Sequence, residues 1–212
     1  MRDAFHEELD RISDQLVEMT RLAGSAINRA TTAVLDADLP LAESVISADE
    51  QIDAIQRGLD EASIDLLARQ QPVATDLRIV VTGMRMSADL ERMGDLARHI
   101  AKVARLRYPD AAVPVDLRET IVEMGRIGEE LARKTGEIID GLDIEAARNL
   151  EEEDDAMDVL HRALFGALLH DHADYPVETA IDVTLIGRYY ERYADHAVSV
   201  ARRLVFLVTG EY

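Results

Sequence analysis

The sequence predicts an all-α protein built from two tandem three-helix bundles, and three observations support this fold class. Apolar residues recur at helical spacing in long blocks. Aromatic residues make up only 4% of the chain, Trp is absent and there are only 5 Pro, whereas good helix formers such as Ala, Leu and Glu are abundant. The second half of the chain also repeats residues of the first half. Together these features predict six long antiparallel helices related by internal duplication.

The first three helices are marked by their apolar periodicity and by their ends. Apolar residues at helical spacing from Phe5 onward predict a long amphipathic helix that ends near Asp36. Pro40 lies at the start of a second helix, and Pro72 ends it. A third helix is expected over about residues 74–106. Because the connections are short, consecutive helices should be antiparallel neighbours.

The second half shows the same plan. A fourth helix is expected over about residues 115–140, and Asp143 is the predicted N-cap of a fifth helix that continues to about His170. Pro176 introduces a sixth helix that reaches Val208. The sequence therefore predicts three helices on each side of a central connection.

The domain boundary is expected in the polar, Pro-containing stretch at residues 107–114. It divides the chain into a first three-helix repeat at residues 1–108 and a second at residues 114–212.

The internal repeat is visible as identical residues at constant offsets. An offset of 105 superimposes Glu18, Met19, Arg21, Asp38, Asp49 and Asp53 on Glu123, Met124, Arg126, Asp143, Asp154 and Asp158. An offset of 100 superimposes Glu91, Arg92, Asp95 and Ala97 on Glu191, Arg192, Asp195 and Ala197. The offset changes because a turn or helix end between the fifth and sixth helices is shorter than its counterpart, as expected for a duplicated three-helix bundle.

Composition restricts the possible functions. The net charge of -19 makes the average surface repel nucleic acid and anionic lipid, so no nucleic-acid partner is expected. The absence of Cys excludes disulfides and thiolate metal sites, so any metal must be bound through oxygen or nitrogen. No apolar stretch approaches the roughly 20 residues that span a bilayer, and the charged N-terminus does not resemble a signal peptide. A soluble, cytoplasmic protein is expected.

Four acidic pairs at i, i+4 spacing are the candidate functional residues. Each pair lies on one helix face, where like carboxylates about 5–6 Å apart repel unless a cation or water screens them. With 42 Asp and Glu in the chain, a single pair is most simply a solvated helix face. Their recurrence in antiparallel neighbours instead predicts four carboxylates gathered in each half, which suits an oxygen-ligated cation. The metal candidates are Asp49, Asp53, Glu91, Asp95, Asp154, Asp158, Glu191 and Asp195.

Histidine and arginine residues lie beside these acids. His99 and His161 share a helix face with Asp95 and Asp158, so each is a candidate ligand, although an ordinary structural histidine is the simpler interpretation. His196 directly follows Asp195 in the chain and therefore does not share its face. Two arginines in the repeated motif, Arg92 and Arg192, either neutralise the acids or bind an anion such as phosphate, and a salt bridge is the favoured interpretation.

Three segments identify a resemblance. DADLPLAESVISADEQID at residues 36–53, SADLERMGDLARHIAKVA at 87–104 and GRYYERYADHAVSVARR at 187–203 resemble the PhoU family, and the resemblance covers essentially the whole chain. It implies a pair of three-helix bundles whose acidic motifs bind iron or another divalent metal cluster in some members. The second half departs from the family pattern at Tyr189, Tyr190 and Tyr193.

The resemblance also implies a function and partners. Family members are expected to act as cytoplasmic negative regulators of phosphate uptake and phosphate-starvation signalling. They link the ATPase subunit of the Pst phosphate ABC transporter to a PhoR-type sensor histidine kinase, so they approach the membrane only through their partners. A homodimer is also implied.

Two other interpretations remain open from the sequence. The first is an enzyme or storage protein, namely a di-metal carboxylate helical-bundle oxidase or a ferritin-like protein, but its Glu-x-x-His motif does not recur here at equivalent positions. The second is a structural adaptor whose acids form a docking face for a basic partner. No Gly-rich phosphate loop or nucleophile motif is present, so the protein is expected not to be an enzyme.

Overall fold

The structure is a computed structural model that describes residues 2–169 and 175–211. The predicted limits at residues 1 and 212 and the predicted end of the fifth helix at His170 lie outside this range. Within the described residues the secondary structure consists of helices, with no strand. The prediction of an all-α fold is confirmed.

Six long α-helices and one short 3-10 helix follow each other in the described part of the chain. They are α1 (Arg2–Asp36), α2 (Leu39–Gln70), α3 (Thr75–Arg107), η1 (Val115–Leu117), α4 (Arg118–Gly141), α5 (Ile144–Leu169) and α6 (Val177–Thr209). The fourth α-helix therefore begins three residues later than predicted, because the 3-10 turn occupies its expected start.

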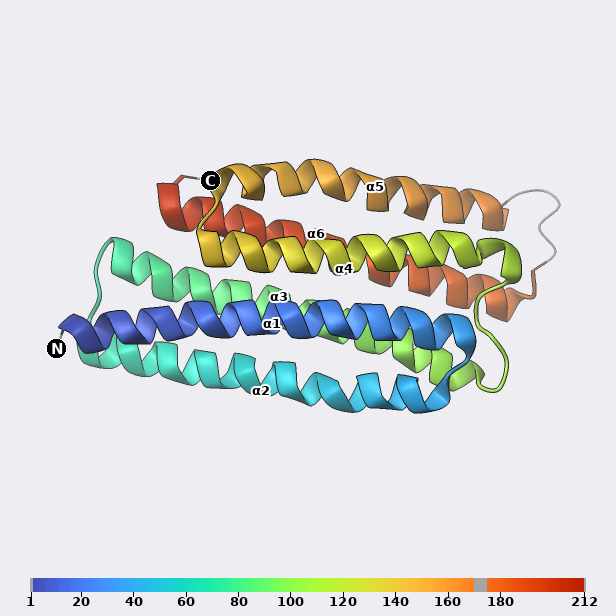
Figure 1. Cartoon of the computed structure of the whole chain (residues 1–212), viewed down its shortest axis with the longest axis horizontal. Helices are drawn as coiled ribbons and strands as arrows, with labels where there is room; N and C mark the ends of the chain where they lie inside the picture. Colours follow the sequence, from blue (N-terminus) through green and yellow to red (C-terminus); the bar gives the residue numbers. More distant parts are fainter. Residues whose placement is uncertain (1, 170–174, 212) are drawn as a thin grey trace.

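The six helices run along the long axis of the molecule in two units that lie side by side (Figure 1). Helices α1, α2 and α3 pack together, as do α4, α5 and α6. The units meet through two contacts, α1 against α4 and α3 against α6. Helices α2 and α5 consequently lie at the two outer edges (Figure 1).

The start of the second helix in each unit uses the same N-cap. The side chain of Asp38 accepts a hydrogen bond of 2.9 Å from the backbone N–H of Leu41 at the start of α2. The side chain of Asp143 accepts one of 3.0 Å from the N–H of Ala146 at the start of α5. Each carboxylate satisfies a backbone donor that has no partner within the helix. The cap predicted at Asp143 is confirmed.

Helices α1 and α4 approach closely because glycine residues face side chains across their contact. A Cβ atom at Gly125 would lie 2.5 Å from Thr31 Oγ1, and one at Gly136 would lie 2.6 Å from Thr20 Oγ1. The earlier glycine of α4 faces the later threonine of α1, and the later glycine faces the earlier threonine, so α1 and α4 are antiparallel. Thr31 also lies 2.6 Å from the buried hydroxyl of Tyr190 on α6, so three helices meet at this point.

The contact between α3 and α6 contains a partly buried polar network centred on Asp89. Asp89 on α3 is 3.0 Å from Nδ1 of His196 and accepts a hydrogen bond of 2.6 Å from Nε of Arg203, both on α6. Burial opposes ionisation of this carboxyl, but the two contacts outweigh it and lower the pKa of Asp89 below its usual value. The network is one of the contacts that join the two units.

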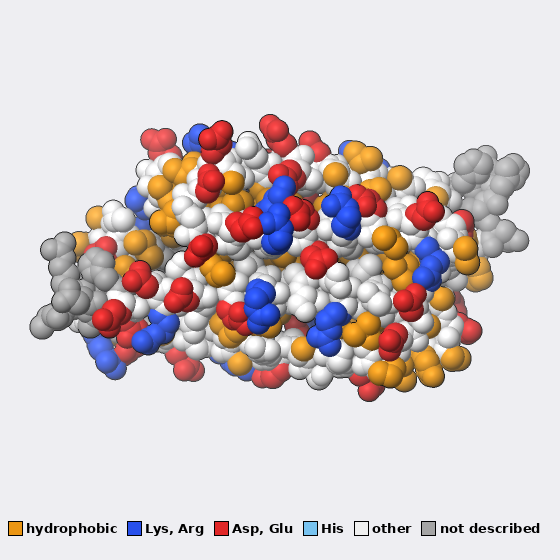
Figure 2. Space-filling view, in the orientation of Figure 1, with side chains coloured by type: hydrophobic (Ala, Val, Ile, Leu, Met, Phe, Trp, Pro, Cys, Tyr) orange, Lys and Arg blue, Asp and Glu red, His pale blue; other side chains and the backbone are white. Residues whose placement is uncertain are grey.

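The surface is strongly charged. Figure 2 shows Asp and Glu side chains spread over the whole visible face, with Arg and Lys side chains interspersed among them. Among the described residues, no helix is long and apolar enough to cross a membrane.

Two glycine substitutions test the close packing of α1 on α4. The substitution Gly125→Ala should displace Thr31 and its contact with Tyr190, and overpacking of this kind typically costs about 1–3 kcal/mol. The control Gly58→Ala lies in the interior of α2 with nothing within 4 Å of the added Cβ, so it should stabilise by roughly 0.5–1 kcal/mol. Thermal unfolding followed by circular dichroism measures both. Equal effects of the two substitutions would contradict the packing described for Gly125.

Candidate functional site

The acidic pairs predicted for the first unit come together between α2 and α3. We call Asp49, Asp53, Glu91 and Asp95 the first cluster. Burial raises the pKa of Glu91, and repulsion from the carboxylates of Asp95, Asp53 and Asp49 raises it further. The two pairs on neighbouring helices are therefore close enough to repel one another.

The second unit repeats this arrangement between α5 and α6. We call Asp154, Asp158, Glu191 and Asp195 the second cluster. Burial raises the pKa of Asp154 to about 7, helped by repulsion from Asp195, Asp158 and Glu191 in that order. The interpretation that each unit gathers four carboxylates therefore agrees with the structure.

An arginine that the sequence interpretation missed neutralises the first cluster. Arg98 on α3 places Nη1 2.5 Å from Asp49 Oδ2 and pairs through Nη2 with Asp95. Both oxygens of Asp49 are buried and neither accepts a hydrogen bond, so the ion pair is their main compensation. Burial nevertheless raises the pKa of Asp49 to about 6 against the opposing effect of Arg98. The sequence held a signal for this ion pair, because Arg98 follows Asp95 by three residues and therefore lies on the same helix face. The second unit has no arginine at the equivalent position, 198.

The second cluster is different at that position. Val198, which is 4% exposed, occupies the place equivalent to Arg98. Among the residues that the structure describes, Asp154, Asp158 and Asp195 form no ion pair. A cavity of about 400 Å³ opens beside them, lined by all three and by Val198.

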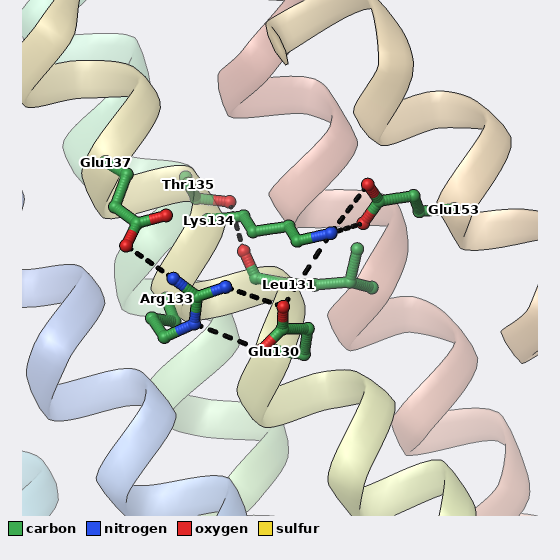
Figure 3. A network of polar contacts seen from close by, with 7 residues as sticks. All are labelled: Glu130, Leu131, Arg133, Lys134, Thr135, Glu137 and Glu153. Atoms are coloured by element: carbon green, nitrogen blue, oxygen red, sulfur yellow. Dashed lines mark hydrogen bonds and ion pairs between the residues drawn. The ribbon is translucent and has the colours of Figure 1, made fainter.

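Basic residues at the margin of the second cluster pair with Glu191, Glu151 and Glu153 rather than with Asp154, Asp158 or Asp195. Arg188 binds Glu191 at one end, and Arg202 binds Glu151 at the other. On the α4 side, Lys134 donates hydrogen bonds of 2.7 and 2.6 Å to the two oxygens of Glu153 (Figure 3). Because Glu153 is directed at α4, the next residue on α5 is turned to a different side of the helix. That residue is Asp154, which interacts with the acids of α6.

The carboxylates are neighbours but do not form a closed coordination shell. Among the described residues, no three His, Asp or Glu side chains are close enough together to hold a metal ion as they stand. Mutual repulsion of four carboxylates favours side-chain positions that separate them. Their donor atoms are oxygens, the type that hard cations such as Ca²⁺, Mg²⁺ and Mn²⁺ prefer.

The three histidines lie in other environments. His99 stacks on Tyr189 with a ring separation of 5.3 Å, and burial lowers the pKa of His99. His161 contacts Phe165 edge to face at 4.9 Å. Buried ring nitrogens without a hydrogen-bond partner occur in both, Nδ1 of His99 and Nε2 of His161. His196 faces Asp89 across the contact between the units, so its partner is not a member of a cluster.

The arginines and tyrosines of the repeated motif also have assigned places. Arg92 donates a hydrogen bond of 2.8 Å to Asp95, as the salt-bridge interpretation expects. Its counterpart Arg192 lines the cavity of the second cluster. Tyr190 and Tyr193 are fully buried in the core, where Leu90 and Met93 occupy the equivalent positions of the first unit. These tyrosines therefore fill the core.

The raised pKa of Asp154 predicts a pH-dependent stability that can be measured. A carboxyl with a pKa of about 7 in the folded state and about 3.9 unfolded holds its proton more tightly when folded, so stability falls as pH rises from about 4 to about 7. The substitution Asp154→Asn removes this effect. Its melting temperature should match the parent protein near pH 4 and exceed it by a few degrees above pH 7.

Thermal unfolding across this pH range, with a chelator present, is the measurement. The exposed residue Asp110 provides a control, since Asp110→Asn should shift the melting temperature little at any pH. An Asp154→Asn protein no more stable than its parent at pH 7.5 would contradict the raised pKa.

Comparisons with known proteins agree on one family. The family model described as the PhoU domain matches residues 16–104 and 121–204. The chain is 49% identical, over the full length of both proteins, to the phosphate-specific transport system accessory protein PhoU homolog 2 of Mycobacterium tuberculosis. It is 47% identical to PhoU homolog 1 of Mycobacterium leprae, over 100% of this chain and 96% of that protein.

Solved structures have the same fold. The crystal structure of PhoU from Pseudomonas aeruginosa superposes with a TM-score of 0.88 at 27% identity, covering 98% of this chain and 100% of that one. The phosphate transport system regulatory protein PhoU from Streptococcus pneumoniae gives 0.86 at 26% identity, covering 98% of each chain. With six helices in the same arrangement and two matches to the family model, one in each unit, this chain belongs to the PhoU family.

Proposed function

We propose that this protein is a non-enzymatic accessory regulator of phosphate transport, which acts in the cytoplasm as a negative regulator of phosphate uptake and phosphate-starvation signalling. The observation that carries this proposal is the full-length similarity to accessory proteins of the phosphate-specific transport system. The complete six-helix fold accompanies that similarity, so the likeness is not limited to a shared motif.

The proposed partners are the ATPase subunit of the Pst transporter and a PhoR-type sensor histidine kinase. The names of the relatives, accessory proteins of the phosphate-specific transport system, support contact with the transporter. The described helices include none that crosses a membrane, so the protein would reach the bilayer through these partners. Self-association into a homodimer is part of the proposal.

We also propose that carboxylate clusters of this chain bind a divalent cation, with iron among the candidates. Support comes from the second cluster, where four carboxylates repel one another and three of them, Asp154, Asp158 and Asp195, line an open cavity. A cation bound there would replace repulsion with attraction and would favour the ionised form of Asp154. The cation would thereby join α5 to α6.

The oxidase or ferritin-like alternative fits the structure less well. In such proteins, side chains from four facing helices converge in the core of one bundle. Here each cluster is built from only two helices, and the acidic members of the second cluster are partly or fully exposed.

The adaptor alternative differs from the metal proposal in one respect. A docking face should keep its partner when metal is removed, whereas a metal-stabilised site should not. Charge reversal at Asp154 and Asp158, with and without a chelator, separates the two.

A phosphate-responsive reporter tests the regulatory role. Deletion of the gene in its host should leave a phosphate-starvation promoter active in phosphate-rich medium, and the intact chain should restore repression. The variant Asp154→Asn with Asp158→Asn should restore it poorly, whereas the exposed-site control Asp110→Asn should restore it fully. A deletion strain that still represses the promoter, with no second member of the family in the host, would contradict the proposal.

Elemental analysis of the purified protein tests the metal proposal. Iron or another divalent metal should be present near stoichiometric amounts and should be lost from a variant with substitutions in both clusters, because each cluster then loses two carboxylates. That variant carries Asp53→Asn, Glu91→Gln, Asp158→Asn and Asp195→Asn. A control with the same change in charge at exposed positions carries Glu43→Gln, Asp110→Asn, Glu119→Gln and Glu145→Gln. Equal metal content in the two variants would count against both clusters.

A further inference from the structure

We infer that the two clusters of this chain have diverged in function: the first is closed by Arg98, an internal guanidinium that takes the place of a bound cation, and the second is the one open to cations. The inference rests on the metal binding proposed above. It assigns that binding to one unit of the molecule and makes Arg98 the residue that decides which unit.

The position of Arg98 is that of a bridging cation. It is on α3, three residues beyond Asp95, and reaches across to Asp49 on α2, so one guanidinium neutralises a carboxylate from each helix. A metal ion joining α2 to α3 would need these same two carboxylates. It would first have to displace a side chain that is only 26% exposed and is held by two ion pairs.

The local packing supports the ion pair. Gly94 immediately precedes Asp95, and a Cβ at this position would lie 2.7 Å from Ile52 Cδ1 and 3.0 Å from Asp49 Oδ1, both on α2. The missing side chain leaves room for the Asp49 carboxylate between α2 and α3, where its side chain is 3% exposed. The second unit has Ala194 at the equivalent position, and Asp154 there is only partly buried. The first unit is therefore built around a buried carboxylate that needs an internal counter-ion.

Other charged groups around the first cluster add to its neutralisation. Arg92 pairs with Asp95 from the exposed side, and Lys102 further along α3 lowers the pKa of Asp49 through its charge. Three cations thus face four carboxylates in the first cluster. In the second cluster Val198 replaces the central arginine, and the arginine pairs at its margin involve Glu191 and Glu151. Arg192 and Arg202, the counterparts of Arg92 and Lys102, also line the cavity, so the two clusters differ in the central guanidinium that bridges two helices. Among the described residues, Asp154, Asp158 and Asp195 have no such ion pair and lie beside this cavity.

Binding of Mn²⁺, followed by electron paramagnetic resonance of the free ion, tests the assignment. The parent protein should bind Mn²⁺, and the variant that combines Asp154→Asn with Asp158→Asn should not. Removal of the guanidinium in Arg98→Val, which copies the second unit, should open the first cluster and raise bound Mn²⁺ per chain about twofold. The reciprocal change Val198→Arg should lower binding.

Two controls accompany these variants. Arg98→Lys keeps a positive charge in the first cluster, although a lysine cannot bridge both carboxylates as the guanidinium does, and should bind less Mn²⁺ than Arg98→Val. Arg105→Val makes the same substitution at an exposed position of α3 and should leave binding unchanged. Thermal unfolding in chelator is a second readout: Arg98→Val should melt lower than both controls because it leaves Asp49 buried without its counter-ion, and Mn²⁺ should restore it.

The possible outcomes separate this inference from the proposed function. Retention of Mn²⁺ in the Asp154→Asn, Asp158→Asn protein, or an unchanged amount bound by Arg98→Val, would overturn the assignment while leaving metal binding intact. If neither the parent nor Arg98→Val binds Mn²⁺, the metal proposal fails and the second cluster is not a cation site. The unfolding comparison in chelator then decides by itself whether Arg98 is the counter-ion of Asp49.

Discussion

The close approach of α1 and α4 sets the arrangement of the other four helices. Small residues on α4 let the two helices lie against each other over most of their length, and α3 and α6 meet behind them. This leaves α2 and α5 at the outer edges, each packed mainly on its own unit. The two acidic clusters lie where these outer helices contact α3 and α6.

An outer helix can carry charge at moderate cost because water still reaches one side of it. The clusters lie at such positions, between α2 and α3 in one unit and between α5 and α6 in the other. Partial burial is enough to raise the pKa values of Asp49 and Asp154, yet it leaves the second cluster beside an open cavity. The fold thus presents ionisable groups that a cation or a partner can still reach.

Duplication gives the two units the same backbone but does not require the same electrostatics. In the first unit a guanidinium lies between carboxylates of two helices, and in the second a valine occupies that place. The core diverged as well, because Tyr190 and Tyr193 replace Leu90 and Met93, and the Tyr190 hydroxyl contacts Thr31 of the other unit. A helical repeat tolerates such changes as long as each side chain fits its own surroundings.

Local patterns in the sequence determined the fold class and the approximate limits of the helices, because apolar periodicity and an N-cap residue such as Asp143 act within a few residues of chain. The repeat also predicted four carboxylates in each half. The tertiary structure decided how they are compensated. The pairing of Arg98 with Asp49 spans two helices, and that of Asp89 with His196 and Arg203 spans two units. Such contacts depend on how each helix is rotated and docked, which is set by packing between residues far apart in sequence.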